Sequence, residues 1–387
     1  MNTFKIFRPI KILAEIFGLS PMTQKLTLSP LKVLQTVILG TTCIYLTSLY
    51  IWFILTQMTF SGVTSPTIMK FVLSFRTGSF TFLMVVAVLS SGTTFKLVAK
   101  TLENMTKIDK DLTELGQKKY LEKRNRHIFR TSVLLIFVMH LMFDTLGGLY
   151  STWSKKSKQV EYFLIHWYPR MLISTKLLAH FLILTVLKAR FEAINNIIDS
   201  IRQNSQTRNQ AVPTGTIKTL VQMHSNLVTT SEEVCDSFSI FGLVWISLIF
   251  VVLIGDAYAV LNSVLFQNVY KPLPIVLSIV KNCLSYCFNL YHLASKSNQL
   301  SREAKVTKTV LLGVKIDICN EEERNSVVAS VLQLMENKIE ITACRLFNID
   351  NALLFAICGS AFSYLFIMLQ FDLNNKKNQS LGNGTTA

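Results

Sequence analysis

Charged residues are scarce in this sequence, and the scarcity limits what the protein can be. Of 387 residues, 16% are charged and 50% are hydrophobic, and apolar runs recur along the whole length. This composition predicts an integral membrane protein. The sequence also lacks a phosphate-binding glycine loop, a cluster of metal ligands and a catalytic constellation. We therefore assign it no enzyme activity, no metal site and no cofactor.

Seven apolar segments have the roughly 20 residues that are needed to cross about 30 Å of hydrocarbon. They lie approximately at 33–55, 67–91, 131–150, 163–187, 238–263, 272–294 and 349–371. The predicted fold class is an all-α membrane protein with seven transmembrane helices. No cleavable signal peptide is expected, because Lys, Arg and Pro residues break the N-terminal stretch.

The positions of Lys and Arg predict the orientation of these helices. The N-terminal segment and the segments after the second, fourth and sixth spans hold 28 Lys and Arg residues, against 7 in the alternate set. Because basic segments stay on the cytoplasmic side, the N-terminus is predicted to be cytoplasmic and the C-terminus extracellular. This is the reverse of a G-protein-coupled receptor. The formal charge of +16 is then explained by orientation and by attraction to anionic lipid, without nucleic acid.

Cysteines are missing from every predicted extracellular loop. All seven lie in or near spans or in cytoplasmic segments, so no disulfide is expected. Cys283 and Cys287 share a helix face, but no nearby His or acid completes a metal site. We interpret them as small packing residues.

Long cytoplasmic segments are predicted to continue the spans as helices. Phe191, Ile194, Ile197, Ile198 and Ile201 form an apolar stripe beyond the fourth span. Before the seventh span, a helix is predicted to carry a coiled-coil-like seam of Val328, Leu332, Met335, Ile339 and Leu346. Packing within one subunit or between subunits would explain these faces equally well. The predicted segments are 1–32 (cytoplasmic), 33–187 (helices 1–4), 188–237 (cytoplasmic extension), 238–294 (helices 5 and 6), 295–348 (cytoplasmic helical anchor), 349–371 (helix 7) and 372–387 (extracellular tail).

Ionisable residues inside the spans are candidates for a binding site, because a charge in hydrocarbon is costly without a partner. The predicted topology places five of them in the outer half or near the midplane: Arg76, Asp144, Arg170, Asp256 and Lys281. Aromatic residues share that level, namely Trp167, Tyr168, Tyr258 and Tyr286. These nine residues are the predicted ligand-binding set. The alternative is that the aromatics are interfacial anchors and that the charges only neutralise one another.

The last apolar segment ends in Ser363-Tyr364, five apolar residues and Gln370-Phe371. This resembles the signature at the end of the seventh helix of insect gustatory receptors, which is Thr-Tyr, five apolar residues and Gln-Phe. Ser363 replaces the usual Thr. Leu365 stands where many sugar-sensing members carry Glu, which argues against that subgroup. Without the resemblance, Gly359 and Ser363 would be read as a helix-packing pair.

The resemblance implies a gustatory chemoreceptor that acts as a ligand-gated, non-selective cation channel in the plasma membrane. Four subunits, in a homo- or hetero-tetramer, would associate through the cytoplasmic anchor and line the pore with their seventh helices. Ser363, Tyr364, Gln370 and Phe371 are then the predicted pore and gate residues. A small-molecule tastant, permeating cations and membrane lipid are the implied partners. The alternatives are an odorant receptor subunit that needs a co-receptor, a G-protein-coupled receptor and a transporter.

Overall fold

The computed structural model describes residues 3–17, 19, 30–56, 66–138, 163–208, 214–266, 273–312 and 339–383, together with positions 325, 328, 329 and 332. The described part is almost entirely helical. The N-terminal half contains α1 (Thr3–Ile16), α2 (Pro30–Thr56), α3 (Pro66–Leu89), α4 (Ser91–Glu114) and α5 (Lys118–Ile136). The C-terminal half contains η2 (Phe163–Trp167), α8 (Tyr168–Arg208), α9 (Thr214–Phe266), α10 (Leu273–Leu312), β1 (Thr342–Ala343), β2 (Phe347–Asn348) and α12 (Asn351–Asn383).

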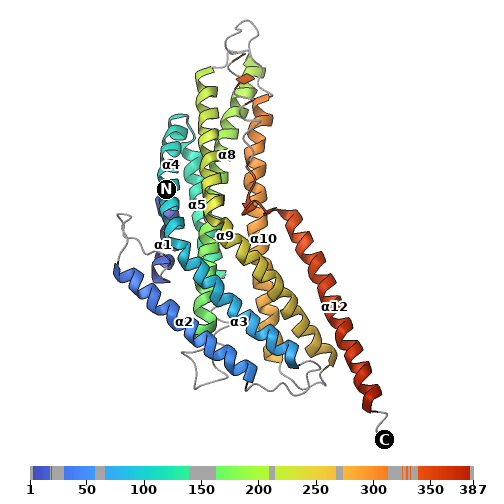
Figure 1. Ribbon diagram of the computed structural model, residues 1–387. Helices are drawn as coiled ribbons and strands as arrows, with labels where there is room; N and C mark the ends of the chain where they lie inside the picture. The colour runs from blue at the N-terminus through green and yellow to red at the C-terminus, as the bar shows by residue number, and fades with distance from the viewer. Residues whose placement is uncertain are drawn as a thin grey trace.

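Three long helices, α8, α9 and α10, form the centre of the subunit and run side by side for much of their length (Figure 1). The most extensive packing joins α8 to α10. The stripe predicted beyond the fourth span belongs to α8, where Phe191, Ile194, Ile197 and Ile198 are buried. Apolar residues at steps of three and four therefore place one face of α8 against its neighbours.

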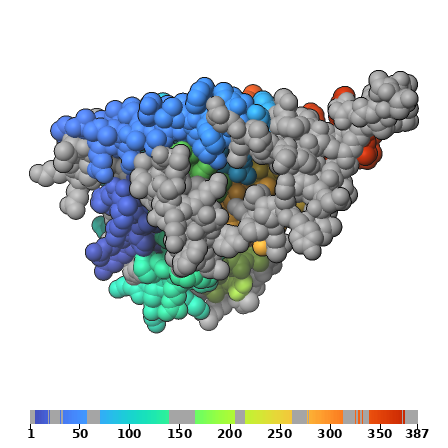
Figure 2. Space-filling model, turned by 90° about the horizontal axis from the view of Figure 1, so that it is seen from below, coloured from blue at the N-terminus to red at the C-terminus, as the bar shows by residue number. Residues whose placement is uncertain are grey.

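The shorter helices cover this centre on one side. α3 packs against both α8 and α9, whereas α2 packs mainly on α3. Seen from below, α2 forms one edge of the molecule, while α12 emerges away from the bundle (Figure 2). α1, α4 and α5 also pack against α8, and α4 and α5 lie nearer the C-terminal end of α8 than α2 and α3 do (Figure 1).

Polar contacts hold α4 and α5 against α8. Arg190 is fully buried and donates to both carboxylate oxygens of Asp109, at 3.0 and 2.9 Å, and to Asn125 at 3.1 Å. Nearby, the Tyr120 hydroxyl donates to Glu192 at 3.0 Å. Burial, together with the Glu192 charge, raises the pKa of Tyr120 to about 12.

The helix predicted to continue through Ile339 and Leu346 is wrong, because the chain forms a small hairpin there. β1 and β2 pair antiparallel, with Thr342 opposite Asn348. The Leu346 N–H donates to the Ala343 carbonyl at 3.0 Å, and the intervening Cys344 and Arg345 have φ angles of 50° and 59°. Since left-handed backbone conformations cannot belong to a right-handed helix, the chain reverses here before α12 begins.

In the part of the chain that the structure describes, five helices are long and apolar enough to cross a membrane, at 33–56, 70–89, 165–204, 215–261 and 351–371. They overlap the first, second, fourth, fifth and seventh predicted spans. The sixth predicted span lies within α10, and the third continues from α5 into residues outside the described part. α12 continues without a break to Asn383, so the helix extends well into the predicted 372–387 tail.

Candidate functional site

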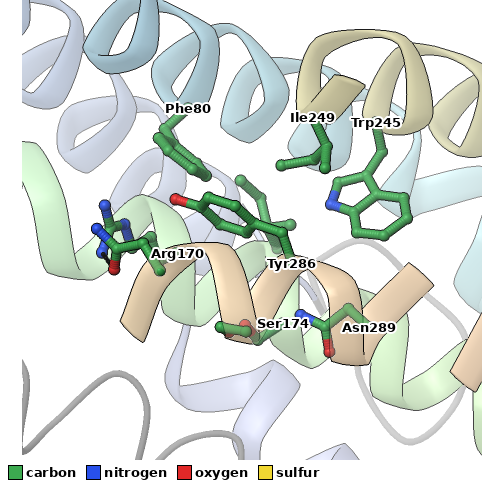
Figure 3. Close-up of a pocket in the computed structure, with 10 residues that line it drawn as sticks. Phe80, Arg170, Ser174, Trp245, Ile249, Tyr286 and Asn289 are labelled. Carbon is green, nitrogen blue, oxygen red and sulfur yellow. Dashed lines mark hydrogen bonds between the residues drawn. The ribbon is translucent and has the colours of Figure 1, made fainter. Parts of the chain in front are cut away.

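A cavity lies among α3, α8, α9 and α10 and is lined by residues of the predicted membrane spans (Figure 3). The space between its lining atoms is about 370 Å³, part of which is open to the outside. Its interior is narrow, with room for little more than water. The lining residues are Phe80, Arg170, Ile173, Ser174, Trp245, Ile249, Asn282, Ser285, Tyr286 and Asn289.

Helix geometry explains how these side chains come to face one space. Asn282, Ser285, Tyr286 and Asn289 recur at steps of three and four along α10, so they lie on one face. The lining residues of α8 and α9 repeat at the same spacing. Polar groups are thus concentrated on the α10 face, within a span that is otherwise apolar.

Aromatic side chains form one wall of the cavity. The ring centroids of Phe80 and Tyr286 lie 5.8 Å apart, tilted by 33°. Trp245 is almost fully buried and lies toward the Asn289 end, as Figure 3 shows. The Arg170 guanidinium lies 4.9 Å from the centre of the Phe80 ring, a favourable cation–π distance. The wall therefore suits a flat or apolar group better than a strongly hydrated one.

Several buried polar atoms at this site have no hydrogen-bond partner among the described residues. They are the Arg170 Nε, the Tyr286 hydroxyl and the Asn289 Oδ1. Arg170 is otherwise held by a 2.9 Å bond from its Nη1 to the Asn282 Oδ1. Since a buried polar atom without a partner costs about 1–3 kcal/mol, these three atoms mark where water or a ligand would bind.

A buried ion pair lies next to the cavity. The Arg76 Nη1 and the Asp256 Oδ1 are 3.1 Å apart, and the Asp256 side chain is 2% exposed. Arg76, Arg170 and Tyr286 all interact electrostatically with Asp256. The structure thus brings together four of the nine predicted ligand-binding residues, two of which line the cavity.

Two of the predicted aromatics face a different neighbour. Trp167 and Tyr168 both pack around Phe17, which follows α1, with ring centroids 6.2 and 6.4 Å away. The Tyr168 hydroxyl donates to the Phe17 carbonyl at 3.0 Å. The π-helical turn η2 ends at Trp167, and its extra residue per turn changes which face each side chain occupies.

The remaining predicted residues do not line the cavity. Tyr258 is fully buried and Lys281 is half-buried, but neither is among the lining residues. Asp144 lies outside the described residues. The sequence-based set in turn missed Phe80, Trp245 and the three amide or hydroxyl residues of α10. The repeating polar positions at 282, 285 and 289 were the signal that would have revealed the α10 face.

The predicted pore residues lie on α12, which stands away from the bundle (Figure 1). Ser363, Tyr364, Gln370 and Phe371 are all exposed, Phe371 by 65%. Tyr364 makes an edge contact with Phe250 of α9, at 6.2 Å between ring centroids. In the described part of the chain, no group of three or more His, Cys, Asp or Glu residues is placed to hold a metal ion.

The described structure is a bundle that contains several helices long enough to span a membrane, with a partly open, aromatic-walled cavity among them. Residues 7–375 match the family described as 7tm Chemosensory receptor. Because this match covers nearly the whole chain, the protein belongs to that family, and the predicted relationship to insect gustatory receptors is confirmed. The family is one of chemosensory receptors rather than enzymes.

Three Drosophila melanogaster proteins illustrate the sequence relationship. The chain is 27% identical over 178 residues to putative gustatory receptor 28b, a stretch that covers 45% of this chain and 38% of that protein. It is 22% identical to putative gustatory receptor 28a over 45% of this chain and 39% of that one. It is 23% identical to the gustatory receptor for bitter taste 66a over 38% and 30%. The chain thus matches less than half the length of each relative.

Solved structures show the same fold. The insect olfactory receptor OR5 from Machilis hrabei superposes with a TM-score of 0.70, at 11% identity, over 95% of this chain and 98% of that one. A second structure of the same receptor, in complex with eugenol, matches equally well. The all-helical, seven-span fold predicted from the sequence is therefore confirmed.

Proposed function

We propose that this protein is a subunit of a ligand-gated cation channel, opened by a small-molecule tastant that binds in the cavity. The observation that carries the proposal is the exposure of α12. Only 6% of its membrane-crossing window is buried within the subunit, against 83% for α8. A helix that makes so few contacts in its own subunit is available to line a pore with copies from other subunits.

The exposed residues on α12 support an oligomer. Phe355, Phe362, Phe366 and Phe371 are each at least 63% exposed, yet Gly359 and Ser363 lie on the same helix. Small and polar residues gain nothing from lipid, but they suit helix–helix contacts or a water path. We therefore assign α12 to the centre of a tetramer, with the cytoplasmic helices as its anchor.

The cavity supports a small organic ligand. Its aromatic wall and unpartnered polar atoms provide both apolar contact and hydrogen bonding. The related olfactory receptor fold has been solved with eugenol, which is a small aromatic molecule. Because the cavity is narrow as it stands, a ligand must favour a wider conformation, and a ligand that binds the open state more tightly shifts the channel toward opening.

The gate in this proposal is formed by Gln370 and Phe371. Four Phe371 rings at a constriction would exclude water, and rotation of α12 would replace them with Gln370 amides. Cations would then cross the plasma membrane of a taste neuron, with the N-terminus cytoplasmic and the C-terminus outside.

Recording from cells that express the chain alone tests this function. At least one member of a panel of bitter compounds and sugars should evoke rapid cation current, and Phe371→Ala should produce ligand-independent leak. Leu373→Ala, also on exposed α12, is the matched control and should leave the closed state intact. Current that appears only with an added co-receptor would favour an odorant receptor subunit. A slow response abolished by G-protein blockade would refute the channel.

Crosslinking tests the arrangement of α12 separately. In a background with Cys287→Ser and Cys358→Ser, which removes the two exposed cysteines among the described residues, Gln370→Cys should form covalent dimers when membranes are oxidised, because α12 helices of neighbouring subunits face one another. Leu187→Cys is fully buried in α8 and should form none. Equal crosslinking of the two variants, or of neither, would contradict a central position for α12.

A further inference from the structure

We infer that the cavity prefers a ligand that pairs a flat aromatic ring with an anionic oxygen group, such as an aromatic carboxylate. The inference rests on the proposed ligand-binding role of the cavity and concerns the chemistry that the cavity selects. Figure 3 shows the arrangement: the Tyr286 hydroxyl points toward the Arg170 end, between Arg170 and Phe80.

Charge is unbalanced at this end of the cavity. The titratable groups around Arg170 in the described residues are His166, Arg76, Asp256 and Tyr286. Arg76 already pairs with Asp256 at 3.1 Å. Arg170 has no carboxylate within 4.0 Å in the described structure, and its one side-chain hydrogen bond there is to the neutral amide of Asn282. Among the residues that the structure describes, one cationic charge is therefore left for a ligand to neutralise.

The unpartnered donors point to the same chemistry. The Arg170 Nε and the Tyr286 hydroxyl are buried without partners, and both can donate to an oxygen. A guanidinium and a carboxylate form strong, charge-assisted hydrogen bonds, which strengthen when water is excluded. A neutral ligand of the same shape would leave the cation uncompensated.

The aromatic wall defines the other half of the ligand. Phe80 and Tyr286 lie 5.8 Å apart, and Trp245 and Ile249 continue the apolar lining. Stacking against such rings favours a flat aromatic group. At the far end, the Asn289 Oδ1 accepts hydrogen bonds and is unpartnered in the described structure, so a ring donor such as a hydroxyl would add affinity there.

The test compares benzoate with benzamide, which has nearly the same shape but no charge. Binding to the purified full-length chain would be followed by quenching of tryptophan fluorescence, with Trp245→Phe showing how much of the signal comes from the cavity. We expect benzoate to bind at least about tenfold more tightly than benzamide. This readout does not require the channel to open. Binding without current would therefore refute the proposed channel and leave the inference standing.

Substitutions at Arg170 locate the preference. Arg170→Gln should make the two probes bind equally, whereas Arg170→Lys, which keeps the charge, should retain part of the preference. Tyr286→Phe should weaken benzoate several-fold. Arg126→Gln, an exposed cation on α5, is the matched control and should change nothing. Equal binding of the two probes to the unmodified protein, binding of neither, or a benzoate preference that survives Arg170→Gln would each overturn the inference.

Discussion

α8 and α12 are both apolar helices long enough to cross a membrane, but they are stabilised in opposite ways. α8 buries 83% of its membrane-crossing window within the subunit, and α12 buries 6%. Both helices are apolar enough to be candidate membrane spans, so apolar composition alone does not explain the contrast. The packing contacts of α8 therefore come from its own subunit, whereas most of the surface of α12 is left to be covered by molecules outside the subunit.

The largest effect expected on α8 comes from removing its buried cation. Arg190→Met would remove both hydrogen bonds to the partly exposed Asp109 and the one to the buried Asn125, at a cost of about 3–5 kcal/mol. The purified protein should lose many degrees of thermal stability, or surface expression should fail. Arg202→Met, which breaks an exposed pair with Asp199, should cost less than about 1 kcal/mol. Similar losses in both variants would contradict the importance of the Arg190 contacts.

A matched pair of phenylalanines tests the comparison directly. Phe181 on α8 is 2% exposed and Phe355 on α12 is 79% exposed. Phe181→Ala should cost about 3 kcal/mol, because it leaves a cavity in the core. Phe355→Ala should leave the fold of the subunit within about 0.5 kcal/mol of the original. The melting temperature in detergent measures both, and equal shifts would break the comparison.

Two glycines make the same comparison on a smaller scale. A Cβ at Gly255 of α9 would lie 2.9 Å from the Cγ1 of Val72 on α3, whereas one at Gly359 of α12 would meet nothing within 4 Å. Gly255→Ala should therefore cost about 1–3 kcal/mol through overpacking. Gly359→Ala should be close to neutral for the isolated subunit. If size-exclusion chromatography shows that Gly359→Ala loses the oligomer, then neighbouring subunits supply the contacts of Gly359.

The smallest expected effect lies in the hairpin that leads into α12. Arg345 has a φ of 59°, which glycine adopts without strain. Arg345→Gly should stabilise the turn because it relieves this strain. The gain should be only about 1 kcal/mol or less, because glycine also increases the conformational freedom of the unfolded chain. Glu340→Gly, just before β1 at a position whose φ is not positive, is the matched control and should not stabilise the protein. A lower melting temperature for Arg345→Gly would show that the side chain has a role of its own.

Much of the fold could be predicted from the sequence because apolar length and periodicity determine it. The α8 stripe at 191, 194, 197 and 198 is buried as expected. The helix predicted through Ile339 and Leu346 was wrong, because neither Cys344 nor Arg345 is a residue type that signals a left-handed turn. The hydrophobic pattern alone carried no indication of the reversal.

The cavity was less predictable, for a geometric reason. The rule that buried charges need partners identified Arg76, Asp256 and Arg170, which the structure places close together. Their depth followed from the topology, but the rotation of each helix did not. Trp167 and Tyr168 share the depth and yet pack on Phe17, because the π-helical turn alters the face that they present.

The length of α8 has a mechanical consequence. Its 41 residues form one uninterrupted helix, about 60 Å long at 1.5 Å per residue. Arg170 stands near one end, and Arg190 clamps the helix roughly 30 Å away, at the same rise per residue. With Arg190 as a fulcrum, a pivot of only 2° would shift the cavity end by about 1 Å. If the proposed ligand widens the cavity by tilting α8 about Arg190, the opposite tip would move by a similar amount, and α8 would act as a lever between the two ends of the subunit.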